Sequence, residues 1–552
     1  MDSMTAISTA ERHLGFALKP FQLDAVHSLL DRKDVMLSAP TGSGKTAIYQ
    51  AACLATRDSG CTVVLSPLIA LIRDQQRRMD EARIPCASFY GQVPRTERRY
   101  LRERVDAGEI DIVLTTPETL GLDRGLRAAL INRVPLLVVD EGHAYEEWAH
   151  SFRPAYRRIG AVAESLGAER LLICSATLSA VAAAEAAEAL GRWDWEVICE
   201  PPARPNLRYV GRSWQTQWDM LAWMKRGQTP GIIYTTAARS AESLYEAATN
   251  VTELPVDVYH GKLPRLERNA AQSQWMFSDR WMIATKAFGM GIDRPNVRTV
   301  AHSELPASIS DYAQESGRAG RDGHEAVCAL NKTDSGRVAE FLVEQSYPSI
   351  ERVKAVYQAY DDDWEQVSIR EIAQRVGLKT ATVRAARGWL IGAGMLDRRP
   401  AARDWLVEID DLGVMALPTG KQGQRMREAV KAIKLMARQT ENGLAATSDE
   451  LAGALESTYR DWRGALRRLQ DRGALRAVAP GRTGQARRRG VWTDFRADRL
   501  VRARKRAKAK LAEMKAFAIS PDGGRAAAIE AAVRLDADEA EEEIRWRREE
   551  AK

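Results

Sequence analysis

Short runs of consecutive apolar residues recur through the first 335 residues of this chain, and each is separated from the next by a helical stretch. Strands with one wet face alternate apolar and polar residues, whereas strands covered on both faces are apolar throughout. The runs therefore predict parallel sheets covered by helices. They are 35–37, 62–65, 111–114, 136–139 and 171–173, then 231–234, 256–259, 281–284 and 297–300.

The spacing of these runs divides the chain into parts. A Pro-rich stretch at 201–205 separates the two sets of strands and predicts two α/β lobes, 1–203 and 204–336. Beyond them, two similar segments each have a Ser N-cap, a short helix, a longer helix ending in Gly and an apolar stretch. They predict tandem winged-helix-like domains at 337–412 and 413–494. A helical tail at 495–552 turns from basic to acidic, a pattern typical of mobile segments.

Composition restricts the partners and the compartment. The net charge is +7, and the basic excess is concentrated between residues 421 and 510, which favours a polyanionic partner. No apolar stretch reaches 18 residues, so we expect a cytoplasmic protein without a membrane anchor. The cysteines have no CxxC spacing, and we expect neither disulfides nor bound zinc. They are Cys53, Cys61, Cys86, Cys174, Cys199 and Cys328.

A glycine-rich segment, residues 39–46, follows the first predicted strand and opens a helical stretch. Gly42 and Gly44 allow backbone N–H groups to turn toward phosphates at a helix N-terminus. The Lys45 ammonium can reach β- and γ-phosphates, and the Thr46 hydroxyl suits Mg²⁺. The segment therefore predicts a site for ATP and Mg²⁺. Its candidate nucleotide-binding residues are Pro40, Thr41, Gly42, Ser43, Gly44, Lys45 and Thr46.

An acidic pair, Asp140 and Glu141, directly follows the apolar run at 136–139. At the carboxyl end of a parallel strand, Asp140 can hold the Mg²⁺ that Thr46 contacts. Glu141 can orient or deprotonate the attacking water. Alone, such a pair is usually a helix cap or a surface charge. Together with the glycine-rich segment it predicts a complete ATP hydrolysis site.

The second lobe carries two arginines one helical turn apart in the segment Gln314–Arg321. An arginine that reaches the γ-phosphate from across a cleft couples hydrolysis to lobe closure. We predict that Arg321 is this arginine, an arginine finger, that Arg318 is its partner, and that Gln314 belongs to the same catalytic group.

Taken together, the strand runs and motifs predict an α/β fold, with two RecA-like motor lobes, mostly α winged-helix modules and a helical tail.

The most specific segment is Asp140–Tyr156, whose aromatic and charged residues keep the spacing of a loop found in one helicase family. It resembles the RecQ family of superfamily 2 DNA helicases, and the resemblance covers roughly residues 15 to 335. In that family the loop senses single-stranded DNA and signals to the ATPase site. The resemblance assigns this role to Trp148, Phe152 and Arg153, since aromatic stacking on bases is tolerant of sequence.

Further segments resemble the family in the same order. Lys19–Gln22 is similar to the motif that reads adenine through Gln22, with Lys19 where arginine is usual. Residues 175–177 resemble motif III, and 204–207 resemble the segment between the lobes. Ser66 and Pro67 are similar to a motif on the DNA backbone, and residues 284–293 to motif V, which implies that Thr285 lies on the DNA track and Asp293 at the nucleotide. The family's four zinc-binding cysteines have no counterpart, since no cysteine follows Cys328.

The winged-helix-like domains offer a second nucleic-acid surface. The better candidate is the second domain, with a basic recognition helix and a basic wing at 482–489. Such charges neutralise phosphates without reading sequence. Alternatively, either domain packs on the motor or binds a protein partner. The polar residues of the first candidate helix are Thr380, Thr382, Arg384 and Arg387, and those of the second are Tyr459, Arg460, Arg463, Arg467 and Arg468.

These features predict a monomeric ATP- and Mg²⁺-dependent DNA helicase that acts on single-stranded and tailed duplex DNA. The resemblance implies 3′ to 5′ movement. One alternative is a DNA-stimulated translocase that remodels protein–DNA complexes without strong unwinding. Another is a winged-helix DNA-binding regulator whose motor acts as a switch. A third is an RNA helicase.

Overall fold

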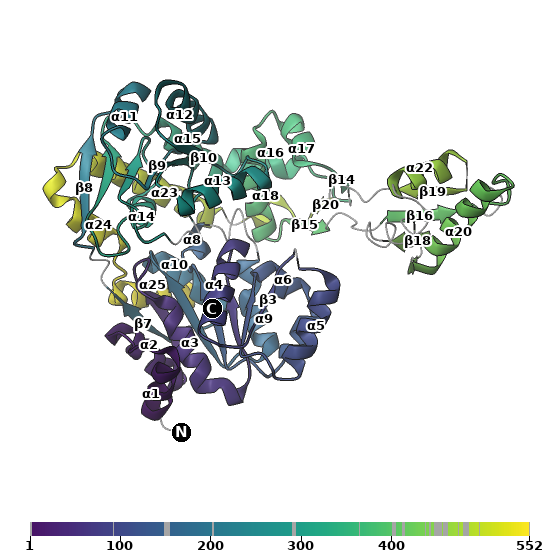
Figure 1. Ribbon diagram of the computed structural model, residues 1–552, viewed down its shortest axis with the longest axis horizontal. Helices are drawn as coiled ribbons and strands as arrows, with labels where there is room; N and C mark the ends of the chain where they lie inside the picture. Colours follow the sequence, from purple (N-terminus) through teal and green to yellow (C-terminus); the bar gives the residue numbers. More distant parts are fainter. Residues whose placement is uncertain are drawn as a thin grey trace. The chain divides into compact units, whose positions relative to one another are not determined.

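The computed structural model describes residues 3–550 apart from 92, 148–154, 201–203, 290–293, 364, 400–404, 411–413, 437, 441–442, 447–454, 456–461, 473, 479–484 and 496. The chain forms two compact units (Figure 1). The first contains residues 1–348 and 497–552, and the second contains residues 349–496. Among the described helices, none combines the length and the apolar character needed to cross a membrane.

The first lobe of unit 1 is built on a seven-stranded parallel sheet with the order β3-β4-β2-β5-β6-β1-β7. Its inner strands are buried on both faces, as the apolar runs predict. The strands are β1 (Asp34–Ser38), β2 (Thr62–Leu65), β3 (Cys86–Phe89), β4 (Ile112–Thr115), β5 (Leu136–Asp140), β6 (Arg170–Ser175) and β7 (Trp195–Cys199). The helices are α1 (Ser3–Leu14), α2 (Pro20–Leu30), α3 (Lys45–Thr56), α4 (Ile69–Glu81), α5 (Arg95–Asp106), α6 (Pro117–Leu122), α7 (Arg124–Leu130), α8 (Ala144–Glu147), α9 (Ile159–Leu166) and α10 (Ala180–Leu190).

The second lobe has a six-stranded parallel sheet with the order β10-β11-β9-β12-β13-β8. The prediction of two RecA-like lobes with parallel sheets is therefore confirmed. The strands are β8 (Leu207–Arg212), β9 (Gly231–Tyr234), β10 (Val256–Tyr259), β11 (Trp281–Ala284), β12 (Thr299–His302) and β13 (Ala326–Asn331). The helices are α11 (Gln217–Met224), α12 (Ala238–Val251), α13 (Arg265–Phe277), α14 (Ile309–Ser316) and α15 (Arg337–Ser346).

Unit 2 begins with a winged-helix arrangement. It contains three helices and a three-stranded antiparallel sheet with the order β14-β20-β15, and β14 follows the first helix. Ser368 caps the second helix with a full capping box, and Gly377 ends it in the left-handed conformation. The elements are α16 (Ile350–Gln358), β14 (Glu365–Gln366), α17 (Ile369–Val376), α18 (Thr380–Gly392), β15 (Leu396–Arg399) and β20 (Gln485–Arg488).

The strand β20 differs from the sequence prediction. Residues 482–489 were expected to form the wing of the second domain, but β20 pairs with β14 and β15 of the first. Arg487 also binds the Asp397 carboxylate of β15 at 3.2 Å. The two domains are therefore not in tandem, because the second is inserted between the wing strands β15 and β20 of the first.

The inserted module has its own antiparallel sheet, with the order β17-β18-β16-β19. The strand β16 belongs to this sheet, although the sequence pattern assigned residues up to 412 to the preceding domain. A separate apolar core includes Ala429, Ile433 and Leu469. The elements are β16 (Trp405–Ile409), α20 (Lys421–Met436), β17 (Arg438–Thr440), β18 (Gly443–Ala446), α22 (Trp462–Asp471) and β19 (Leu475–Val478).

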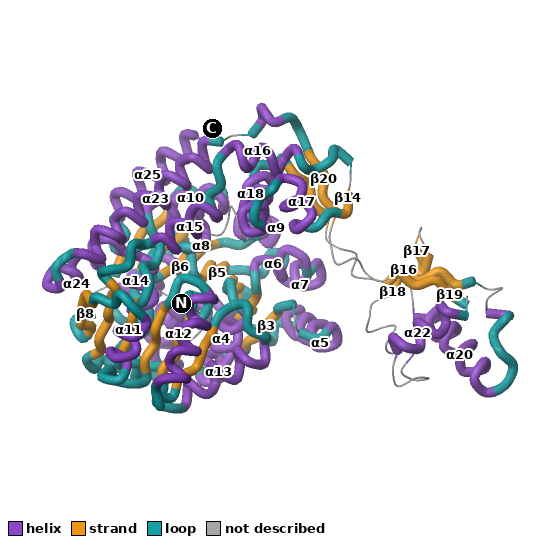
Figure 2. The backbone as a smooth tube through the Cα atoms, turned by 90° about the horizontal axis from the view of Figure 1, so that it is seen from above, coloured by secondary structure: helices purple, strands orange, loops and turns teal. Residues whose placement is uncertain are grey.

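The C-terminal tail returns to unit 1 and packs against it (Figure 2). Ala540 and Ile544 lie in the apolar core of the first lobe, while Met514 and Phe517 lie in a cluster of the second. A mobile tail, as the charge switch suggested, is therefore wrong for these residues, because apolar positions within the charged helices find partners on the lobes. The helices are α23 (Asp498–Ile519), α24 (Arg525–Val533) and α25 (Ala537–Glu550).

Candidate nucleotide and nucleic-acid site

The glycine-rich segment forms a loop between β1 and the N-terminus of α3. Gly42 and Gly44 have φ values of 79° and 92°, a left-handed conformation that favours glycine. The ammonium of Lys45, in the first turn of α3, donates to the carbonyls of Ala39 at 2.8 Å and Pro40 at 3.0 Å. Burial lowers the Lys45 pKa, and the charges of Glu141 and Asp140 oppose this shift. The loop thus places a cation beside the acidic pair.

Gln22 and Lys19 lie against this loop. The buried Gln22 amide donates to Gly44 O at 2.9 Å and to Ser43 O at 3.3 Å, and its oxygen accepts the Lys19 N–H at 2.8 Å. The Lys19 ammonium donates to Ser43 O at 3.2 Å. The Gln22 side chain therefore fixes the loop through its amide nitrogen and caps α2 through its amide oxygen. The resemblance predicted the residue but not this contact.

Asp140 ends β5 on the side of the sheet that faces the loop. Its carboxylate accepts Gln75 Nε2 at 2.9 Å and the backbone N–H of Glu141 at 3.0 Å. Burial and the neighbouring Glu141 charge raise the Asp140 pKa to about 6, although Lys45 acts to lower it. A carboxylate held in this environment suits a divalent cation, whose charge favours the ionised form. Gln75 was not singled out in the sequence, and only its contact with Asp140 identifies it.

Asp140→Asn is expected to stabilise the protein at neutral pH, and it replaces the carboxylate that the sequence predicts as a Mg²⁺ ligand. The folded-state pKa of about 6 lies above the reference value of 3.8, so ionisation of Asp140 opposes folding above pH 6. Allowing for partial exposure, we expect a gain of about 2 kcal/mol in the free energy of unfolding. The gain should fade as pH falls from 6 toward 3.8. Urea unfolding of both proteins without Mg²⁺ at pH 7.5 and pH 4 tests this, and equal stability at pH 7.5 contradicts it.

Glu141 is held in a strained conformation with φ of 57°. The buried His143 connects it to the next motif, since His143 Nδ1 lies 3.3 Å from Glu141 Oε2 and 3.1 Å from Ser175 Oγ. Burial acts to raise the Glu141 pKa, but the His143 hydrogen bond and the charges of His143 and Lys45 outweigh it. The net shift is downward. Glu141 is therefore ionised at neutral pH, as a base must be.

The second lobe presents its two arginines to this site. Arg318 lowers the pKa of Glu141, and Arg321 lowers the pKa of Lys45, so both positive charges act on groups of the first lobe. A direct hydrogen bond also joins the lobes, because Thr41 Oγ1 donates to Gly317 O at 3.2 Å. The predicted Gln314 lies on α14, which leads into this loop. The structure thus brings residues 317–321, here called the arginine loop, to the glycine-rich loop.

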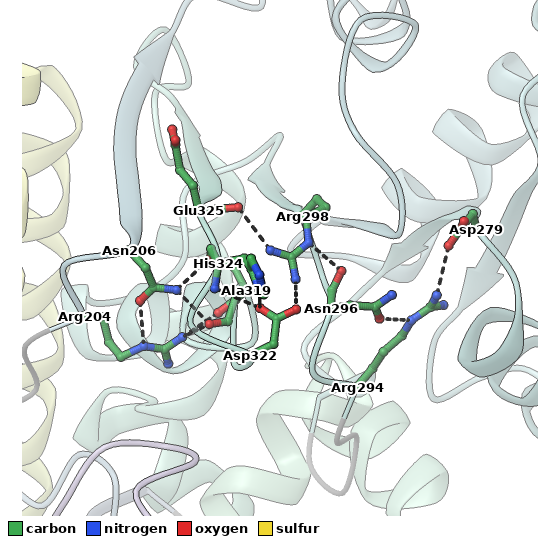
Figure 3. Close-up of polar contacts among 11 residues, drawn as sticks. Arg204, Asn206, Asp279, Arg294, Asn296, Arg298, Ala319, Asp322, His324 and Glu325 are labelled. Carbon is green, nitrogen blue, oxygen red and sulfur yellow. Dashed lines mark hydrogen bonds and ion pairs between the residues drawn. The ribbon is translucent and has the colours of Figure 1, made fainter.

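Two residues from the segment between the lobes hold the arginine loop in place (Figure 3). Arg204 donates to the carbonyls of Ala319 at 2.7 Å and Gly320 at 2.9 Å. Asn206 donates to Gly320 O at 2.7 Å and His324 O at 2.9 Å. Three backbone acceptors in and beside the loop, one of them shared by both side chains, are therefore fixed. In the sequence, Arg204 and Asn206 were identified only by their resemblance to the segment between the lobes, which did not indicate that they hold the arginine loop.

Figure 3 also shows the residues that flank the predicted motif V. Arg294 donates to Ser278 O at 2.9 Å and to Asn296 Oδ1 at 2.9 Å, which ties the end of this motif to the region after α13. Arg298 forms an ion pair with Asp322, just beyond the arginine loop. The residues after motif V are therefore fixed to the arginine loop on one side and to the α13 region on the other.

The candidate DNA-contacting residues fall into three groups. Trp148, Phe152, Arg153 and Arg460 lie outside the described residues, as does Asp293, which was predicted at the nucleotide rather than on the DNA. Thr285, at the end of β11, and Ser66, after β2, are buried in this structure, and Pro67 follows Ser66. Arg463 and Arg467 lie on α22 of the inserted module, and the Arg467 side chain is exposed.

Comparison with known proteins agrees with this geometry. A DEAD/DEAH box helicase family model matches residues 19–185, and a helicase conserved C-terminal domain model matches 216–323. A solved structure of the DUF1998 helicase MrfA bound to DNA covers 72% of this chain and 58% of that chain, with a TM-score of 0.50 and 16% identity. This likeness reflects a shared fold.

Curated relatives are more similar in sequence. ATP-dependent DNA helicase RecQ of Synechocystis is 30% identical over 361 residues, which cover 61% of this chain and 74% of that protein. RecQ of Bacillus subtilis is 31% identical over 57% of this chain and 54% of its own length. ATP-dependent DNA helicase hus2/rqh1 of Schizosaccharomyces pombe is 31% identical over 57% of this chain but 25% of its own length. The chain thus spans between a quarter and three quarters of these relatives, and it belongs to the RecQ family of DNA helicases.

Proposed function

We propose that this protein is an ATP- and Mg²⁺-dependent DNA helicase that moves 3′ to 5′ along single-stranded DNA and unwinds duplexes. One observation carries the proposal. The Thr41 hydroxyl of the glycine-rich loop donates to Gly317 O of the arginine loop at 3.2 Å. Because this contact joins the two loops, opening or closing of the lobes changes the position of the arginines relative to the phosphates. Such coupling is what a nucleic-acid motor requires.

The residues at the site divide the chemistry between the lobes. Lys45 and the α3 N-terminus bind phosphate oxygens, while Thr46 and Asp140 would hold Mg²⁺, which would supply positive charge beside the phosphates. Glu141, with a lowered pKa, accepts a proton from the attacking water. Arg318 and Arg321 stabilise negative charge that develops on the γ-phosphate. Gln22, which contacts the loop, would report to it whether adenine is bound.

The nucleic-acid track is proposed from the resemblance to RecQ helicases. In that family's manner, Trp148 and Phe152 would stack on bases, and Arg153 would contact a phosphate. Their segment directly follows the Asp140–His143 motif in the chain. Movement of this segment on DNA binding is therefore transmitted over a few residues to Glu141. This connection explains how single-stranded DNA would stimulate hydrolysis.

The first test measures ATP hydrolysis by the purified protein with and without single-stranded DNA, and with single-stranded RNA of the same sequence. We expect DNA to raise the rate strongly and RNA to raise it less. Equal rates with and without nucleic acid would exclude a nucleic-acid motor and favour the winged-helix regulator. Stronger stimulation by RNA would identify an RNA helicase.

A second candidate function is a translocase that remodels protein–DNA complexes without strong unwinding. Two features favour it. No cysteine follows Cys328, so the zinc module of the family has no ligands here, and the wing between β15 and β20 carries an inserted module. Duplexes with a 3′ or a 5′ tail separate the candidates. Strand separation on the 3′-tailed duplex supports the helicase and its polarity, whereas stimulated hydrolysis without separation on either duplex supports the remodelling translocase.

Arg467→Ala is expected to weaken binding to single-stranded and tailed duplex DNA without changing sequence preference. Arg467 is exposed on α22, a helix with several other arginines. Removal of one phosphate contact should lower the slope of log affinity against log salt by about 1. Fluorescence anisotropy between 50 and 200 mM salt, roughly the range over which such contacts are titrated, measures this slope. Glu428→Gln on the neighbouring α20 is the control, and an unchanged slope for Arg467→Ala excludes this contact.

A further inference from the structure

The C-terminal tail contacts both motor lobes. On the first lobe, Leu535, Ala540 and Ile544 extend the apolar core. Arg547 is buried and donates to Glu188 at 2.8 Å and Glu185 at 3.2 Å, both on α10. A buried arginine with two carboxylate partners is costly to separate from them. The attachment of α25 to the first lobe is therefore strong.

The tail is attached to the second lobe by different residues. Met514 and Phe517 of α23 and Ile529 of α24 join an apolar cluster that includes Tyr312. The Phe517 and Tyr312 rings lie 5.6 Å apart between centroids. Tyr312 is fully buried on α14, the helix that ends at the arginine loop. Packing of the tail thus reaches the element that carries Arg318 and Arg321.

The helix α23 spans both attachments without a break. Near its start, Arg499 pairs with Glu188 and Arg506 with Glu185 of the first lobe. Near its end, Lys515 pairs with Glu340 on α15 of the second lobe. From Arg499 to Lys515 the helix extends about 24 Å at 1.5 Å per residue. Between these two sets of ion pairs, Ala507 and Leu511 pack in an apolar cluster with Ala339 and Val343 of α15, while Ala509 is exposed.

We propose that residues 497–550 form an intramolecular brace that sets the spacing of the two lobes and so positions the arginine loop of α14 against the glycine-rich loop. The brace rests on the proposed ATPase function. A continuous helix fixed at both ends resists changes in the distance between its ends, so it limits how far the lobes separate. The brace keeps the Thr41–Gly317 contact populated and favours the arrangement in which the arginines reach the phosphates.

The alternative is that each part of the tail only stabilises the lobe on which it packs. The two ideas differ in what the middle of α23 does. Local stabilisation depends on the contacts at the ends and not on a stiff connection between them. A brace depends on the contacts at both ends and also on the stiff helix between them.

The decisive variant is Ala509→Pro, which interrupts α23 between the ion pairs at Arg506 and Lys515 and replaces an exposed side chain. Ala509→Ser is the matched control, since serine keeps the helix. We expect Ala509→Pro to lower the DNA-stimulated kcat by about fivefold, the size of typical long-range coupling. We expect it also to broaden the distance distribution between spin labels on unnatural amino acids at Ser165 and Asn250, exposed positions on the two lobes.

A second variant protects the test against misfolding of the first. Arg499→Ala with Arg506→Ala removes the ion pairs of α23 with the first lobe, and the exposed Lys505→Ala on the same helix is its control. The distance measurement does not depend on hydrolysis, so failure of the ATPase proposal and failure of the brace are distinguishable. Unchanged distances in either folded variant overturn the brace. Changed distances with an unchanged kcat, in a protein whose wild type hydrolyses ATP, overturn its effect on the arginine loop. A wild type that shows no DNA-stimulated hydrolysis overturns the ATPase proposal alone, and the distances still test the brace.

Discussion

Replacement of Arg321 by alanine is expected to lower kcat for ATP hydrolysis by about 10³-fold at saturating ATP and single-stranded DNA, the scale seen for arginine fingers. The reason is electrostatic. Arg321 belongs to the second lobe, yet its charge lowers the pKa of Lys45 at the phosphate site of the first. Without it, negative charge on the γ-phosphate loses a preorganised partner. Steady-state phosphate release measures the loss.

Two further variants make the Arg321 result specific. Arg321→Lys should recover little, because an ammonium lacks the planar fork of a guanidinium. Arg208→Ala removes an exposed arginine of the same lobe that pairs with Glu325, and we expect its kcat to stay within about twofold, as for a surface pair. Affinity for DNA should be unchanged in all three. If Arg321→Ala retains more than a tenth of the wild-type kcat, another residue provides the finger, and Arg318 becomes the candidate.

Glu141→Gln is expected to lower kcat at least about 10²-fold while ATP still binds, because positioned bases contribute at least this much. Glutamine has the shape of glutamate and can keep a contact with His143, but it cannot accept a proton from water. The lowered Glu141 pKa means that the carboxylate is available throughout the neutral range in the wild-type protein. Single-turnover hydrolysis and binding of a fluorescent ATP analogue separate the chemical step from binding.

The control for Glu141 is an acidic residue of the same lobe without a role at the site. Glu103→Gln on α5 changes only an exposed pair with Arg99, so its activity should match that of the wild type. A Glu141→Gln protein that hydrolyses ATP at a tenth of the wild-type rate or faster would show that water is activated elsewhere. Loss of ATP binding would instead point to a collapsed loop.

Much of the motor could be predicted from the sequence because its signals are local. A strand buried on both faces must be apolar throughout, so the core strands such as β2, β5 and β9 are visible as runs. Edge and flanking strands carry weaker signals. For example, β8 has an exposed residue and only two fully buried ones, and it was missed together with β3, β7 and β13. The catalytic motifs were predictable because phosphate binding requires particular residues at fixed spacing.

Contacts between distant segments could not be predicted in the same way. Nothing local in residues 485–488 indicates that they pair with 396–399 rather than with the strand before them. The tail is similar, since its charged helices resemble a solvated segment until Arg547 meets Glu185 and Glu188. Roles that depend on such contacts, including those of Gln75, His143 and Arg204, become clear only when the fold brings the partners together.

The position of the inserted module has a consequence for how this chain arose. Antiparallel partners lie about 5 Å apart, so Arg399 and Gln485, which are paired across β15 and β20, are already close enough for a tight turn. A segment whose two ends meet in this way can be gained or lost in a single genetic event without disturbing its host. A chain in which a two-residue turn replaces residues 400–484 should therefore keep a folded winged helix.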